Sequence, residues 1–197
     1  YRTSNLVVLS PDSKLIIQRR GKDEDNEFRG NWTITGGHVK AGVNYLRAAA
    51  EEAIEELGID ISGLTRQELE ELIQKIMQRL FPIGILGEYV YDIKGDSNKE
   101  RRALYALVLN LEENEMVLRK EAELKQIRDE AKGDIEEAIK ILSKKNEAEP
   151  GKWEVAEMRW LTLDETLAWW RKGEDKFTSD LFGYFFGGDY GEKVINH

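Results

Sequence analysis

The chain has 197 residues and a net charge of −9, with 38 acidic and 29 basic side chains. This length suits one domain with its own core, so we expect a single domain over residues 1–197. No run of Lys or Arg exceeds two residues, which argues against long nucleic acids as partners. The absence of cysteine rules out disulfides and cysteine nucleophiles. No apolar run reaches membrane length and no signal-like start is seen, so we expect a cytoplasmic protein without a membrane partner.

The N-terminal part of the chain predicts a β-hairpin. Leu6–Leu9 and Lys14–Gln18 are short apolar runs, and Ser10-Pro11-Asp12-Ser13 lies between them. Turn-forming residues between two apolar runs are typical of a hairpin.

A strand and a glycine loop are predicted next. Residues 31–35 alternate in polarity and run into Gly36 and Gly37, which predicts a strand that feeds a loop. Trp32 is expected to pack in the core. For His38, directly after the glycines, we favour a structural hydrogen bond over catalysis, because no partner is identifiable.

The most informative stretch is a helix predicted over Asn44–Leu57. Its apolar side chains recur at intervals of three and four residues, as in a helix that faces a core. These side chains are Leu46, Ala49, Ala50, Ala53, Ile54 and Leu57. Gly58 follows at the position where helices commonly end with glycine.

The opposite face of this helix is acidic. Glu51, Glu52, Glu55 and Glu56 lie at helical spacing, where each like-charge pair costs about 0.2–0.5 kcal/mol. Glu55 and Glu56 also lie in the last turn, where the helix dipole favours cations by about 0.3–1 kcal/mol. A solvated acidic face leaves this conflict in place, whereas a divalent cation removes it. We therefore predict that Mg²⁺, or Mn²⁺ in its place, binds Glu52, Glu55 and Glu56.

A second helix and a second hairpin are predicted downstream. Thr65 and Glu68 have the spacing of a capping box, and apolar residues follow at helical spacing as far as Leu80. Ile83–Ile93 and Arg102–Leu111 are predicted as strands around a turn-rich connection.

The segment 112–149 is highly charged and has apolar residues at spacings of three and four, interrupted by Gly133. This pattern predicts one kinked helix or two short ones, acting as a surface cover of the same domain, a lid or a homodimer contact. We expect the fold to tolerate its removal. Trp153–Leu161 is predicted as a strand, and Thr162 to start a helix that runs through Trp170.

Residues 37–59 resemble the Nudix box, G-x5-E-x7-R-E-U-x-E-E-x-G-U, in which U is a bulky apolar residue. The positions that match in register are Gly37, Glu52, Ala53, Glu55, Glu56, Gly58 and Ile59. Val43 stands where the family has Glu, and Glu51 stands where it has Arg. The resemblance implies an α/β (α+β) fold, a Nudix-like α/β/α sandwich with a mixed sheet, in which 112–149 is a helical insertion.

The same resemblance implies the site. Glu52 and Glu56 would hold the metal, with Glu55 adjacent and the Gly36 carbonyl as a backbone ligand. Backbone N–H groups around Gly37 and the helix start would face phosphate. Glu52 and Glu55 are the catalytic candidates, and Glu55 or a more distant glutamate would take the proton of the attacking water.

Three further positions bear on activity. Glu154 and Glu157 belong to the run from Glu154 to Trp160, which resembles the segment before the family's last strand. They are therefore distal candidates for a metal ligand or a base. Arg47 is four residues before Glu51 and could pair with it as an ordinary helix salt bridge. It could also replace the missing arginine, but we favour the pairing.

The implied activity is Mg²⁺-dependent hydrolysis of a diphosphate linkage in a nucleoside diphosphate-linked or similar small molecule. The departures at Val43 and Glu51 leave an alternative, in which the chain is a catalytically weakened Nudix-like module with a nucleotide-binding or regulatory role. Residues 37–59 and their flanks also resemble isopentenyl-diphosphate isomerases, but the chemistry of those isomerases relies on a cysteine, which the chain lacks.

Overall fold

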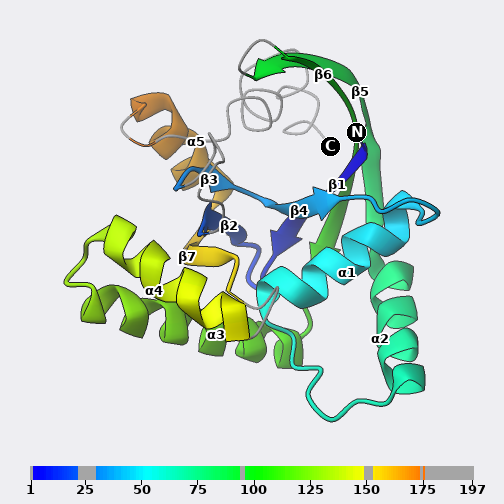
Figure 1. The fold of residues 1–197 in the computed structure, drawn as a ribbon. Helices are drawn as coiled ribbons and strands as arrows, with labels where there is room; N and C mark the ends of the chain where they lie inside the picture. Colours follow the sequence, from blue (N-terminus) through cyan, green and yellow to red (C-terminus); the bar gives the residue numbers. More distant parts are fainter. Residues whose placement is uncertain (1, 22–29, 94–95, 149–152, 174, 176–197) are drawn as a thin grey trace. The chain divides into compact units, whose positions relative to one another are not determined.

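The computed structural model describes residues 2–21, 30–93, 96–148, 153–173 and 175, and only the backbone is described over 85–100. The structure is a mixed α/β fold, as predicted (Figure 1). It divides into two compact units. Unit 1 contains Tyr1–Asp12 and Ile34–Lys120, and unit 2 contains Ser13–Thr33 and Glu121–His197. The single domain over 1–197 stays a prediction.

Unit 1 is built on a mixed sheet, which confirms the expected sheet type. Strand β1 (Arg2–Leu9) pairs in parallel with β6 (Asp96–Val108) and antiparallel with β4 (Thr35–His38). Strand β5 (Phe81–Ile93) pairs antiparallel with β6. The sheet contributes a buried apolar layer that includes Leu6, Val8, Leu104 and Leu107.

The hairpin of β5 and β6 is confirmed, but it is longer than predicted. Its ladder runs from Phe81 opposite Ala106 to Ile93 opposite Asp96. Residues 96–101 are polar, so their sequence carries no strand-like alternation. They join the ladder because its hydrogen bonds are made by backbone groups.

The strand predicted over residues 31–35 is two strands. Strand β3 (Trp32–Thr33) belongs to unit 2 and β4 to unit 1. The glycines predicted as a loop lie inside β4, where Gly36 is opposite Asn5 and Gly37 is opposite Ser4 of β1. The prediction of a loop at Gly36 and Gly37 is therefore wrong. Strand pairing is made by backbone groups, so two glycines without side chains can still take part in it.

Two helices of unit 1 begin and end where local signals predict. Helix α1 (Tyr45–Leu57) has Asn44 as its N-cap and left-handed Gly58 as its C-cap. Helix α2 (Arg66–Arg79) starts with a complete capping box between Thr65 and Glu68. The apolar face of α1 is buried through Ala48, Ala49, Ala50, Ala53, Ile54 and Leu57.

An ion pair joins the end of α2 to the start of α3 (Leu111–Glu130). Arg79 donates to both carboxylate oxygens of Glu113, at 2.5 and 2.8 Å, and to the Val108 carbonyl at 2.6 Å. Glu113 is 6% exposed and also accepts from the Asn110 backbone at 2.9 Å. This pairing raises the pKa of Arg79.

The segment predicted as an insertion forms two helices, α3 and α4 (Ile135–Ala148). The chain turns between them through Lys132 and Gly133, which have φ values of 54° and 80°. Its apolar stripe is buried at Val117, Leu124, Ile127, Ala131, Ala138, Ile139 and Leu142. Removing the segment would uncover the residues against which this stripe packs, which argues against the expectation that the fold tolerates its loss.

Unit 2 contains three described strands and the helix α5 (Leu163–Lys172). Strand β2 (Leu15–Arg20) pairs antiparallel with β3 and with β7 (Val155–Leu161). Helix α5 starts after Thr162, as predicted, and Thr162 forms a capping box with Glu165. Trp32 is fully buried, which confirms its predicted place in the core.

Candidate active site

Helix α1 is fixed at its start by two polar contacts in unit 1. The Asn44 side chain accepts from the Arg47 backbone at 2.8 Å, which satisfies one of the free N–H groups of the first turn. The Ser4 hydroxyl of β1 donates to the Tyr45 carbonyl at 2.8 Å. These contacts hold the register of α1 against the sheet.

Strand β4 presents its two glycines to the acidic face of α1. The Gly36 N–H donates to the Glu56 carboxylate at 2.9 Å. A Cβ atom at Gly37 would lie 2.5 Å from the carboxyl carbon of Glu52, so this carboxylate lies directly against the glycine backbone. The carboxylates of Glu52 and Glu56, one turn apart on α1, therefore both lie against the Gly36–Gly37 dipeptide.

Gly36 also allows β1 and β4 to approach closely. A Cβ atom there would lie 2.6 Å from the Ser4 carbonyl oxygen and 2.8 Å from the Asn5 Cα. These are backbone atoms of a paired strand and have little freedom to move. The two glycines thus have different roles, since Gly36 admits the neighbouring strand and Gly37 admits Glu52.

The other predicted site residues of unit 1 are more open. Glu55 is exposed on α1. His38 is exposed at the end of β4, opposite Thr3 of β1. Within the described ranges, no three side chains of His, Cys, Asp or Glu form a group that could hold a metal ion. A metal site here would therefore use two carboxylates, and the ligand assignments stay predictions.

A pair of carboxylates fits the chemistry of Mg²⁺. This ion prefers hard oxygen ligands and is commonly held by one or two carboxylates together with water and substrate phosphates. Glu52 and Glu56 supply carboxylates at one place on the strand. The donor set also suits Mn²⁺, which accepts carboxylate and carbonyl oxygens.

Arg47 forms the predicted pair with Glu51, with 2.8 Å between its Nε and the Glu51 Oε1. It also donates two hydrogen bonds to Glu70 on α2, at 2.7 and 2.8 Å. These bonds raise the pKa of Arg47 and lower that of Glu70 to about 2. Arg47 therefore clamps α1 to α2, which does not favour it as a replacement for the missing box arginine.

The role of Glu70 was not found from the sequence. It is 23 residues from Arg47, and no local spacing rule connects the two helices. The only available signal was the helical pattern itself, which places Glu70 one turn after the Thr65 cap.

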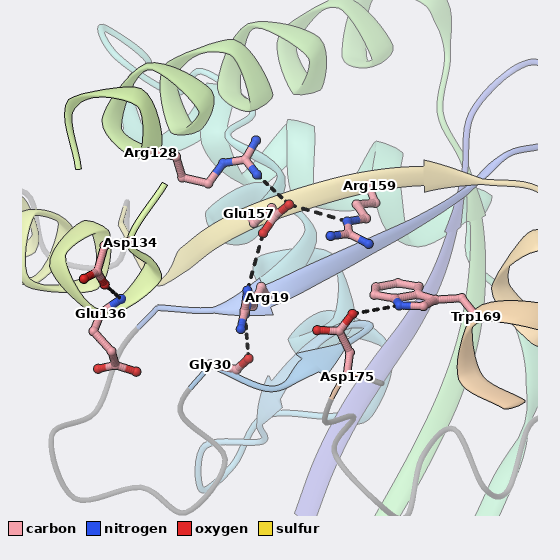
Figure 2. A network of polar contacts seen from close by, with 9 residues as sticks. All are labelled: Arg19, Gly30, Arg128, Asp134, Glu136, Glu157, Arg159, Trp169 and Asp175. Carbon is pink, nitrogen blue, oxygen red and sulfur yellow. Dashed lines mark hydrogen bonds and ion pairs between the residues drawn. The ribbon is translucent and has the colours of Figure 1, made fainter. Parts of the chain in front are cut away.

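The two distal candidates belong to unit 2. Glu157 is buried on β7 and accepts from Arg128 at 2.5 Å and from Arg159 at 3.4 Å (Figure 2). Glu154 is half-buried, and its carbonyl accepts from the Gly21 N–H at 2.7 Å. A metal ion at Glu157 would compete with guanidinium groups for its lone pairs. The catalytic roles of both residues stay predictions.

No helix in the described ranges is long and apolar enough to cross a membrane.

Comparisons with known proteins connect the chain to one family. The family model described as NUDIX domain matches residues 1–181. An uncharacterized Nudix hydrolase of Yersinia pestis is 39% identical over 59 residues, which are 30% of this chain and 32% of that protein. The chain thus matches about a third of that relative's length.

Two solved structures are similar over nearly the whole chain. The MutT protein of Methanosarcina mazei Go1 has 14% identity and a TM-score of 0.49, covering 99% of this chain and 92% of that one. The NUDIX domain of Shewanella oneidensis NrtR, solved with ADP ribose, has 10% identity and a TM-score of 0.46, covering 98% and 83%. Because the family model spans nearly all of the sequence, the chain belongs to the Nudix family.

Proposed function

We propose that this protein is a Mg²⁺- or Mn²⁺-dependent hydrolase that cleaves a diphosphate linkage in a small molecule, such as a nucleoside diphosphate joined to another group. The observation that carries the proposal is the meeting of Glu52 and Glu56 at Gly36 and Gly37. Membership of the Nudix family supports the reaction class. The two carboxylates support the use of a divalent metal.

The roles of the residues follow from their positions. When bound, the metal would neutralise diphosphate charge and polarise the attacking water. Glu52 and Glu56 would hold it through carboxylate oxygens, with the Gly36 carbonyl as a further ligand. The Gly36 N–H fixes one oxygen of Glu56, which limits the side chain's rotation before metal binds. Glu55 is exposed beside them and would accept the proton of water.

Phosphate release from a panel of diphosphates tests this function. The panel contains nucleotide sugars, dinucleotides, nucleoside triphosphates and isoprenoid diphosphates, each with Mg²⁺ and with EDTA. We expect turnover that needs the metal and falls about 10²-fold or more in Glu56→Gln. Glu71→Gln, on the exposed side of α2, should leave the rate unchanged. Turnover that is equal in Glu56→Gln and wild type would contradict the site.

A second candidate is a Nudix-like module that binds a nucleotide with little or no hydrolysis. It is favoured by Arg47, whose guanidinium is engaged by Glu51 and Glu70. The family's box arginine therefore has no evident replacement on the described part of α1.

The double change Val43→Glu with Glu51→Arg separates the two candidates. In a slow hydrolase it should raise the rate, because it restores the carboxylate and guanidinium of the family's box. Arg47 would keep its pair with Glu70. A fast wild type would make the change neutral or harmful. Binding of Mg²⁺ and nucleotide without turnover in either protein would favour the binding module.

A further inference from the structure

Three arginines surround one buried carboxylate in unit 2 (Figure 2). Glu157 exposes 8% of its side chain, and its Oε1 accepts from Arg128 Nη1 and Arg159 Nε. Its Oε2 lies 3.7 Å from Arg19 Nη1. The four residues come from α3, β2 and β7. They are called the arginine cluster below.

The arginine cluster has more positive than negative charge. One carboxylate offsets one guanidinium, so two formal positive charges remain, although the whole chain carries −9. The neighbouring Asp175 accepts from the Trp169 indole at 2.9 Å instead (Figure 2). Among the described residues, Glu157 is the one carboxylate found to pair with these arginines. The excess charge favours an anionic ligand.

The guanidinium groups also retain donors for such a ligand. Each guanidinium has five N–H groups, and Glu157 engages one nitrogen of each. The Nε of Arg128 is buried and has no hydrogen-bond partner in the described part of the chain. The side chains of Arg19, Arg128 and Arg159 are 23%, 30% and 40% exposed. The buried Nε of Arg128 is enclosed, but the partly exposed side chains leave other guanidinium N–H groups open to a ligand.

Two tryptophans hold Arg159 and Arg19 in place. The Arg159 guanidinium lies 4.5 Å from the ring centroids of both Trp32 and Trp169, which is within the range of cation–π attraction. Arg19 lies 5.6 Å from the Trp32 ring centroid, and its Nε donates to the Gly30 carbonyl at 2.7 Å. Planar groups fixed in this way lose little freedom on binding.

We propose that the arginine cluster binds a phosphoryl group, as free phosphate or pyrophosphate or as the phosphate of a nucleotide. Guanidinium groups match phosphate oxygens through paired hydrogen bonds. One guanidinium would satisfy Glu157 in a purely structural network, whereas the other two add repulsion that a bound anion removes. The proposal does not rest on the proposed hydrolase activity, because it involves none of the residues assigned to the metal.

Calorimetric titration of pyrophosphate into the full chain in EDTA tests the proposal without a metal. We expect one saturable site, with a Kd raised about tenfold or more in Arg159→Gln and in Arg128→Gln. Arg119→Gln is the matched control, because this α3 arginine is 78% exposed and should leave the Kd unchanged. Tryptophan fluorescence gives a second readout, since two rings contact Arg159.

Separate titrations with phosphate, pyrophosphate and AMP identify the source of the phosphoryl group. Equal affinity for phosphate and AMP indicates recognition of the phosphate alone, and tighter binding of AMP indicates a nucleotide. Arg159→Lys keeps the charge but loses the planar fork, so it should bind more weakly than wild type. If Arg128→Gln fails to fold, as judged by circular dichroism, the Kd of Arg159→Gln decides the result, because Arg159 is the more exposed of the two. No saturable binding by wild type, or equal affinity in Arg159→Gln and Arg119→Gln, overturns the proposal.

Discussion

Substituting Gly37 by alanine should impair the proposed metal site while leaving the fold intact. The added Cβ would lie 2.5 Å from the carboxyl carbon of Glu52, and the three nearest atoms all belong to that carboxyl group. Gly37 does not have a positive φ, so alanine fits its backbone. The end of a glutamate side chain can rotate away, which relieves the clash but moves the carboxylate away from its place beside Glu56.

The matching substitution, Gly36→Ala, should instead destabilise the fold. Its Cβ would meet the Ser4 carbonyl oxygen at 2.6 Å and the Asn5 Cα at 2.8 Å, and a paired strand cannot rotate away. Overpacking of this kind costs about 1–3 kcal/mol. For Gly37→Ala we expect less than about 1 kcal/mol, because the gain from a less flexible unfolded chain, about 0.4–1 kcal/mol, offsets the rotation of Glu52.

Urea unfolding and metal titration of the two variants measure these effects separately. Gly37→Ala should keep the wild-type unfolding midpoint and lose about tenfold or more in Mn²⁺ affinity, as when a group that supports a ligand is changed. Gly36→Ala should lower the unfolding midpoint. Wild-type Mn²⁺ affinity in Gly37→Ala would refute the assigned place of Glu52. A large loss of stability in the same variant would refute the reasoning about its freedom to rotate.

Three further predictions concern the scaffold. Glu113→Gln should destabilise the protein by about 2–4 kcal/mol, because it breaks a largely buried pair with Arg79, and lower the Tm in calorimetry by about 5–10 °C. Arg47 holds the pKa of Glu70 at about 2, so the stability from this pair should be complete above the unfolded pKa near 4.3 and be lost as pH falls to about 2. Urea midpoints of wild type and Glu70→Gln should therefore converge in acid. Replacing 112–149 with a Gly/Ser linker should abolish cooperative unfolding, because it would uncover the residues against which the buried apolar stripe of this segment packs.

Matched controls make these outcomes specific. Glu112→Gln changes an exposed residue in the same turn of α3 and should leave the Tm unchanged. Glu71→Gln changes an exposed residue beside Glu70 and should keep the acid dependence of wild type. A difference between wild type and Glu70→Gln that is constant from pH 6 to about pH 2 would contradict the assigned pairing. A folded protein lacking 112–149 would show that the stripe is not part of the core.

Local signals predicted the ends of helices well. Asn44, Thr65 and Thr162 cap three helices, and Gly58 ends α1 in the left-handed conformation. Each of these contacts joins residues three or four positions apart, so the sequence alone contains both partners. The Arg47–Glu51 pair was predictable for the same reason.

Contacts between distant residues could not be predicted in this way. The pairing of β1 with β4 brings Gly36 opposite Asn5, and it turned a predicted loop into a strand. Arg128 reaches Glu157 across 29 residues, and no spacing rule relates a helix to a strand that far along the chain. The sequence indicated that Glu52 and Glu56 share a helix face, but the place where they meet β4 came from the structure.

Calorimetric titration of Mn²⁺ into wild type, Glu52→Gln, Glu56→Gln and the control Glu71→Gln tests the central assignment most directly. We predict one site in wild type and in Glu71→Gln. The affinity should fall about tenfold or more in both other variants, because each loses one of two carboxylates beside the glycines of β4. Equal Mn²⁺ affinity in all four proteins would contradict the assignment of this face of α1 as the metal site.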